Sequence, residues 1–201
     1  MAKRNRVLRG KRGARTAWGL ARGFRIAPFA SGDPEDEHDP ECYELAWDGH
    51  PVLVAREGDD VHIASADFQK WHPFFAPLVI ALRRLPSPSW VGEGFLCDFD
   101  DEGKPCFGSL RRAVKGDQQR TVMVVWDLLY LEGRDLRAEP WRTRRAELAR
   151  LLKGASSRIA SSQTLLGPRA EVLRAVRARG LLGIVGRDPD ATYGTPRRMW
   201  P

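Results

Sequence analysis

The sequence predicts an α+β domain, on three observations. Apolar runs of strand length and runs with helical spacing follow one another without a regular βαβ order. The 201 residues are 42% hydrophobic and 29% charged, a composition typical of a globular protein with a core. No apolar run reaches the roughly 18 residues that would span a bilayer. Strands and helices are therefore expected to share one soluble domain without membrane contact.

The first 41 residues fall into two blocks of opposite charge. Residues 1–25 contain nine basic residues and no acidic one, and Arg and Gly interrupt every apolar run, which excludes a secretory signal. Residues 26–41 contain six acidic residues around Pro34 and Pro40, which disfavours regular structure. We expect a basic arm over 1–25, either solvated or in contact with phosphates, and an acidic linker over 26–41. The folded domain is expected over 42–201.

A group of short strands is predicted to open this domain. Apolar or alternating runs at 43–47, 51–56 and 61–65 are separated by Asp48-Gly49 and by an acidic turn at 57–60, a pattern typical of an antiparallel meander. Asp48-Gly49 is interpreted as a tight turn, because glycine adopts positive φ without cost.

Helices and strands alternate through the rest of the chain. Helical spacing, with proline near the starts and glycine or proline at the stops, predicts four helices, at 75–85, 107–114, 140–153 and 168–179. Continuous apolar runs predict four further strands, at 90–99, 121–130, 158–161 and 183–187.

The cysteines and histidines indicate no metal centre. Three cysteines, at 42, 97 and 106, are too few and too scattered for a disulfide framework or a CxxC metal site, which favours a reducing cytoplasm. The four histidines lie in unrelated local patterns without ligand spacing. No GxSxG, HExxH or Walker loop is present.

Three segments carry motifs that can be compared with a known family. Residues 43–49 have the sequence YELAWDG, and residues 180–187 have the sequence GLLGIVGR. Residues 125–136, VWDLLYLEGRDL, are followed by Pro140, Arg144 and Arg145. In order, they resemble the ExKxDG, GLEGIVAKR and FDLLYLDG motifs of ATP-dependent DNA ligases of the bacterial end-joining type. The likeness covers about residues 25–201. It implies the nucleotidyltransferase fold of a ligase adenylation domain, ATP-grasp-like, in which antiparallel sheets flanked by helices hold ATP between them.

The resemblance also implies that this chain has lost the residue that accepts AMP in the family. In the family a lysine attacks the α-phosphate of ATP and holds AMP as a phosphoramidate, which requires a nucleophilic amine. The matching position is Ala46, so no catalytic residue is predicted. Two family arginines and the glutamate of GLEGIVAKR match Pro51, Ala66 and Leu182. The terminal KxK lysines and an oligonucleotide-binding (OB) domain are not expected after Pro201.

Three positions are interpreted as a remnant of the ATP pocket. Trp126 matches the aromatic residue that stacks on adenine, Glu93 matches the glutamate of the DGE motif, and Arg187 matches the lysine of GLEGIVAKR. For Trp126 the favoured alternative is an ordinary core aromatic. One carboxylate holds Mg²⁺ poorly, so no metal site is predicted.

The sequence therefore predicts a non-catalytic homologue of a ligase adenylation domain, with a DNA-binding or repair-accessory role and no resident cofactor. Partners are expected to be DNA and other end-joining or repair proteins. DNA contacts are expected at eight basic residues, Lys3, Arg4, Arg6, Arg9, Lys11, Arg12, Arg144 and Arg145. Two alternatives stay open. One is an active ligase that uses ATP and Mg²⁺ through a displaced nucleophile, and the other is a regulatory partner of a complete ligase without DNA binding.

Overall fold

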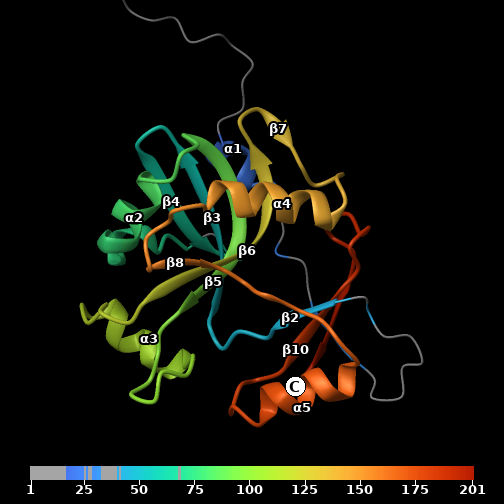
Figure 1. Ribbon diagram of the computed structural model, residues 1–201. Helices are drawn as coiled ribbons and strands as arrows, with labels where there is room; N and C mark the ends of the chain where they lie inside the picture. The colour runs from blue at the N-terminus through green and yellow to red at the C-terminus, as the bar shows by residue number, and fades with distance from the viewer. Residues whose placement is uncertain (1–16, 25, 27–28, 33–39, 41, 68) are drawn as a thin grey trace, which may run out of the picture.

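A computed structural model describes residues 17–201 except residues 25, 27–28, 33–39, 41 and 68. Within these residues, two β-sheets pack against each other and helices cover their outer faces (Figure 1). The α+β class predicted from the sequence is confirmed.

The larger sheet has six strands. Five of them pair in the antiparallel order β4 (Asp60–Ser65), β3 (His50–Glu57), β5 (Ser89–Cys97), β6 (Val122–Leu131) and β7 (Arg134–Asp135). The sixth, β8 (Ile159–Ser161), runs parallel to β6. Both faces of β5 and β6 are buried, which explains why these strands are almost continuously apolar.

The smaller sheet brings together segments that are far apart in the sequence. Its order is β1 (Phe29–Ser31), β11 (Arg197–Trp200), β10 (Ile184–Arg187), β2 (Cys42–Leu45) and β9 (Thr164–Leu165). All neighbours are antiparallel except β1 and β11, which are parallel. Residues 29–45 and residues 164–200 therefore meet in one sheet.

Three helices pack on one face of the six-stranded sheet, with the short 3-10 helix η1 (His72–Phe74) preceding the first of them. They are α2 (Ala76–Arg83), α3 (Phe107–Val114) and α4 (Trp141–Leu151). Leu82, Leu110 and Leu148 from these helices join Trp90 and Leu128 from the sheet in one apolar core. The helix α5 (Arg169–Arg177) places Val176 against the five-stranded sheet. The opposite face of the six-stranded sheet is left for the smaller sheet and for the N-terminal helix.

The folded part begins earlier than residue 42. Helix α1 (Ala17–Ala21) lies within the segment expected to be a basic arm, yet Ala17 and Ala21 are fully buried against Leu53 and Leu129. Strand β1 likewise lies within the segment expected to be a linker. Their apolar contacts come from distant segments, so local composition could not reveal them. The prediction of a domain over 42–201 is therefore corrected.

Asp48-Gly49 does not close a hairpin. The chain leaves the smaller sheet after β2 and enters the larger sheet at β3, so these two residues cross between sheets. Gly49 is not among the glycines with positive φ. A Cβ at Gly49 would instead lie 2.7 Å from both the Sγ of Cys97 and the carbonyl oxygen of Leu96. Close backbone approach, rather than a turn, requires glycine here. The predicted β3–β4 hairpin is confirmed.

Candidate functional site

The inner surface between the two sheets contains Trp126. This residue of β6 is 1% exposed and belongs to a cluster with Phe95 of β5 and Val185 of β10. Its ring centroid lies 4.9 Å from that of Phe95 and 5.2 Å from that of Phe29. Trp126 is thus a core aromatic of the interface between the sheets, as the favoured alternative in the sequence analysis had it.

Two guanidinium groups cover the ring of Trp126. The Cζ atom of Arg187 is 4.5 Å from the ring centroid, and that of Arg197 is 4.3 Å from it. Both distances are within the range of cation–π attraction. Strands β10 and β11 supply these arginines, so the smaller sheet brings its own cations to the aromatic surface of the larger one.

Each of these arginines is paired with a buried carboxylate. Arg187 donates through Nε to Glu44 of β2, and the Nη1 atom of Arg145 lies 3.6 Å from the other oxygen of Glu44. Arg197 donates to Glu93 of β5 at 2.9 Å, and the hydroxyl of Tyr193 donates to the second oxygen of Glu93. Both carboxylates are almost inaccessible, at 0% and 1% exposure.

A third pair lies next to these two. Arg144 of α4 donates to both carboxylate oxygens of Asp127, at 2.8 and 2.9 Å, and both side chains are buried. Such two-point pairs combine charge with fixed geometry. We call the whole group the intersheet cluster: Glu44, Glu93, Asp127, Arg144, Arg145, Arg187 and Arg197.

Burial and neighbouring charges shift the pKa values of three groups at the cluster. Burial by itself lowers the pKa of Arg187, but the nearby carboxylates of Glu44 and Asp127 outweigh it and raise that pKa. Burial together with the charge of Glu93 raises the pKa of Tyr193, which keeps the phenol protonated as a donor. Burial lowers the pKa of Arg145, yet its partner Glu44 opposes the shift.

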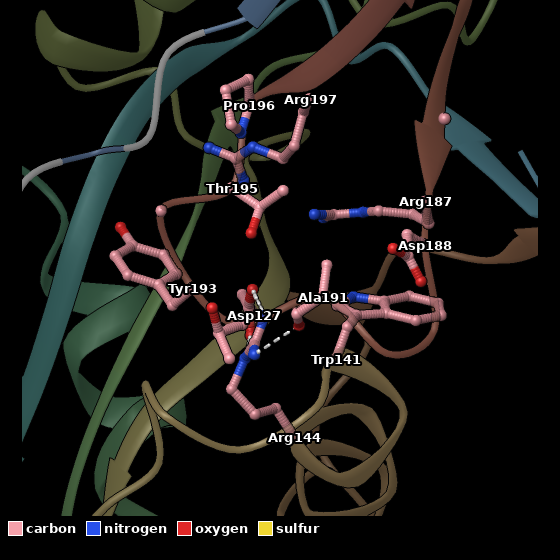
Figure 2. A pocket seen from close by; sticks show the side chains of 13 residues that line it. Asp127, Trp141, Arg144, Arg187, Asp188, Ala191, Tyr193, Thr195, Pro196 and Arg197 are labelled. Carbon is pink, nitrogen blue, oxygen red and sulfur yellow. Dashed lines mark hydrogen bonds and ion pairs between the residues drawn. The ribbon is translucent and has the colours of Figure 1, made fainter.

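A small cavity of about 40 Å³ lies beside the cluster (Figure 2). It is lined by Asp127 of β6, Trp141 and Arg144 of α4, Gly186 and Arg187 of β10, Asp188, residues 191–196 and Arg197 of β11. Figure 2 shows the guanidinium of Arg187, the indole nitrogen of Trp141 and the hydroxyl of Thr195 turned toward the same space.

A larger cavity of about 360 Å³ contains the position of the missing lysine. Ala46, Asp48, Pro105 and the loop 180–182 line it. Asp48 accepts a hydrogen bond from the backbone N–H of Phe107 at 3.2 Å. Lys104 lies at its edge, since a Cβ built on Gly180 would be 2.8 Å from the Nζ atom of Lys104.

The expected DNA contacts at Arg144 and Arg145 are not supported by their positions. Arg144 is 2% exposed and is held by Asp127, and the side chain of Arg145 is 18% exposed and faces Glu44. The guanidinium of Arg144 therefore lies on no surface that a duplex could approach, and that of Arg145 lies beside the buried carboxylate of Glu44. The other six expected contacts, Lys3, Arg4, Arg6, Arg9, Lys11 and Arg12, lie outside the described residues.

The structure does bring together the three residues interpreted as a pocket remnant, Glu93, Trp126 and Arg187. Four more members of this site, Glu44, Asp127, Tyr193 and Arg197, were not predicted. A signal existed for two of them, because Glu44 and Asp127 are single carboxylates within apolar strands. Arg197 had no such signal, since it belongs to a strand that pairs across the chain termini.

Two absences hold for the part of the chain that the structure describes. No three side chains of His, Cys, Asp or Glu lie together in a way that could hold a metal ion. No helix is long and apolar enough to cross a membrane.

Curated relatives resemble most of this chain but are much longer. The multifunctional non-homologous end joining protein LigD of Pseudomonas aeruginosa is 30% identical over 192 residues, which are 94% of this chain and 22% of that protein. DNA ligase C of Mycobacterium tuberculosis is 25% identical over 78% of this chain and 48% of its own length. The chain thus spans between about a fifth and a half of these relatives.

Solved structures show the same fold. The ligase domain of M. tuberculosis LigD superposes with a TM-score of 0.68 at 24% identity, over 88% of this chain and 56% of that one. Chlorella virus DNA ligase–adenylate superposes with a TM-score of 0.58 at 16% identity, over 85% and 63%. The adenylation-domain fold expected from the motifs is therefore confirmed. Residues 34–201 match the model of the ATP dependent DNA ligase domain, and the chain belongs to this family.

Proposed function

We propose that this chain is a non-catalytic member of the ligase family with a DNA-binding or repair-accessory role. One observation carries the proposal: alanine occupies position 46, where the family motif has the lysine that accepts AMP. A methyl group has no lone pair to attack a phosphate, and no general base can supply one.

The residues between the sheets support this proposal, because they do not fit ATP. The face of Trp126 is taken by Arg187 and Arg197. Glu44 and Glu93 are engaged by arginines, so neither is available to Mg²⁺ together with nucleotide phosphates. We therefore propose no step that involves ATP.

Helix α5 is the surface we propose for DNA, in place of Arg144 and Arg145. Three of its basic residues, Arg174, Arg177 and Arg179 just after its end, are exposed. Residues three apart share a helix face, so Arg174 and Arg177 can meet successive phosphates. Lys104 adds a fourth charge beside Gly180. A solved relative of the same fold is described as binding DNA with a minimal scaffold, and LigD is named for end joining, which supports this role.

The first test is the covalent AMP adduct. The protein is incubated with ATP and Mg²⁺ and its intact mass is measured beside an active ligase. We expect no mass increase. We also expect none for Ala46→Lys, because Pro51, Ala66 and Leu182 still lack the family's polar groups. Circular dichroism checks that the variant folds. An AMP adduct on the wild-type chain would contradict the proposal, and AMP transfer by a folded Ala46→Lys would contradict the argument that the residues between the sheets do not fit ATP.

The displaced-nucleophile alternative has a concrete candidate in Lys104, which lies at the edge of the Ala46 cavity. If the wild-type chain gains the mass of AMP, peptide mapping and Lys104→Arg decide whether this amine carries it. An adduct on Lys104 would replace the proposed function with a nucleotidyltransferase.

The second test is the salt dependence of duplex binding. We expect the affinity to fall steeply between 50 and 200 mM salt, since phosphate contacts release counterions. Replacing Arg174, Arg177 and Arg179 by alanine should reduce the slope of log affinity against log salt by about 3. A matched control removes three exposed charges elsewhere, Arg83, Arg84 and Arg134. Equal effects of both triple variants would reject α5 as the contact surface, and no binding at all would favour the regulatory-partner alternative.

A further inference from the structure

We infer that residues 17–24, which are helix α1 and the turn after it, form a pH-sensitive latch on the six-stranded sheet. The latch is closed while His62 and His72 are neutral, and it opens when they take up protons. The inference does not depend on the proposed function, because neither the Ala46 cavity nor helix α5 takes part in it. It combines a stacked ring contact, two buried imidazole nitrogens and the charges around them.

The latch contacts the edge strand β4 through a pair of stacked rings. The ring centroids of Trp18 in the latch and His62 in β4 are 4.4 Å apart, and the ring planes are 11° from parallel. The ring of His72 in η1 meets that of His62 edge to face, with centroids 5.2 Å apart. His62 therefore contacts both the latch and η1, so a change in its charge acts on the latch directly.

Among the described residues, the closed state offers no acceptor at one nitrogen of each imidazole. The Nδ1 atoms of His62 and His72 are buried and have no hydrogen-bond partner there. A neutral imidazole carries one N–H, whereas the protonated ring carries two. Burial lowers the pKa of His72, and Lys70 lowers it too, whereas the backbone of Ile63 raises it. Protonation leaves a buried Nδ1–H without an acceptor, and opening of the latch exposes it to water.

The charges around His62 also oppose its protonation. Burial is the largest cause that lowers the pKa of His62, and the charge of His72 lowers it further. Lys70 and Arg22 act in the same direction, whereas the carboxylate of Asp60 raises this pKa. Because protons bind more readily in the open state, the latch opens as the pH falls.

Arg22 belongs to the latch, so part of this repulsion acts on the latch itself. Its Cζ atom lies 5.9 Å from the centroid of the Trp18 ring. A protonated His62 brings a second cation to the same ring. Repulsion between the two cations therefore offsets the cation–π attraction that Trp18 provides.

Apolar packing and a hydrogen bond to Glu57 hold the closed latch. Ala17, Ala21 and Phe24 are buried against the sheet beside Leu53. The backbone N–H of Ala17 donates to the Oε2 atom of Glu57 at 2.9 Å. A helix of five residues does not persist without such tertiary contacts. Weakening of the ring contact therefore shifts a local opening equilibrium while the two sheets stay folded.

Hydrogen exchange followed by mass spectrometry tests the latch between pH 7.5 and 5.5. The amides of Arg22, Gly23 and Phe24 donate to carbonyl oxygens within the latch and report its opening. After correction for the intrinsic exchange rate, their protection should fall about tenfold, because a pKa difference of one unit changes an opening equilibrium by up to that factor. Peptides from β5 and β6 should change less than about twofold. Unchanged protection of the latch, or an equal loss in β5 and β6, would overturn the inference.

A double variant identifies the titrating groups. His62→Gln/His72→Gln keeps polar side chains and should make the protection of residues 17–24 independent of pH. His50→Gln is the matched control, because burial lowers the pKa of His50 as well and its Nε2 atom is also buried without a partner among the described residues. Its ring stacks on Trp71 rather than on a residue of the latch, so this variant should keep the wild-type profile. A double variant that keeps the pH dependence, or an equal effect of His50→Gln, would also overturn the inference.

Discussion

The two faces of the six-stranded sheet are buried equally well but are stabilised by different physics. On the outer face, helices α2, α3 and α4 pack apolar side chains such as Leu82 and Leu128 against the strands. On the inner face, much of the contact with the smaller sheet consists of paired charges around Trp126. Around Trp126 the inner space is occupied by the guanidinium groups of Arg187 and Arg197.

This difference indicates which substitutions each face of the sheet tolerates. Apolar contacts lose stability in proportion to the area and volume removed, and neighbours relax partly into the gap. A buried ion pair behaves otherwise, because losing one partner leaves the other charge without solvation. The inner face should therefore be sensitive to single changes and tolerant of matched ones.

The largest expected effect is from Arg144→Met. Asp127 would remain buried without its two-point partner, which should lower the free energy of unfolding by about 3–5 kcal/mol. Urea denaturation measures it. The double variant Arg144→Met/Asp127→Leu removes both charges and should recover a large part of the loss. If the double variant loses as much free energy of unfolding as the two single variants together, the fit of the side chains rather than their charge stabilises this face.

The pH dependence between 5 and 7 should come from outside the cluster. Burial lowers the pKa of His62 and of His72, which pack edge to face next to Trp18 of α1. The positive charges of His72, Lys70 and Arg22 also lower the pKa of His62, whereas the carboxylate of Asp60 raises it. Because folding lowers both histidine pKa values, the unfolded chain binds protons at a higher pH than the folded chain does. Stability should therefore fall as the pH drops below about 6.5.

Thermal unfolding from pH 7.5 to 5 measures this effect, which should be smaller than that of Arg144→Met. The variant His62→Gln/His72→Gln should flatten the profile. A profile that keeps its slope in this variant would mean that another group dominates the pH dependence, such as His50, whose pKa burial also lowers.

The smallest effect is expected for an ion pair at the surface. Arg142 of α4 pairs with Asp190, and both side chains are 63% exposed. Arg142→Ala should change the free energy of unfolding by less than about 1 kcal/mol, because water screens the pair. Arg142 and Arg144 are two residues apart on the same helix, so Arg142→Met, measured beside Arg142→Ala, gives the comparison in which element and substitution are constant and burial differs. A loss comparable to that of Arg144→Met would remove the distinction drawn between the two environments.

The sequence predicted those elements whose cause is local. Helix α3 was predicted with the bounds observed, and α2, α4 and α5 to within a few residues, because helical spacing and the flanking Pro and Gly residues are local signals. The same holds for β5 and β6, whose apolar runs reflect burial on both faces. Strands β7, β9 and β11 were not predicted, although β2, β8 and β10, which are also only three or four residues long, were.

By itself, the sequence determined that this chain has an α+β fold, which motifs identify it as ligase-like, and that position 46 holds no nucleophile. These follow from residue identity and from periods of a few residues. Only the tertiary structure decided that Arg144 and Arg145 are internal counterions, that α1 and β1 belong to the folded part, and that two arginines cover Trp126. Each of these depends on contacts between segments far apart in the chain, up to 168 residues for Phe29 and Arg197 (197 − 29). Whether an arginine contacts a carboxylate or a phosphate is decided by which groups the fold places beside it.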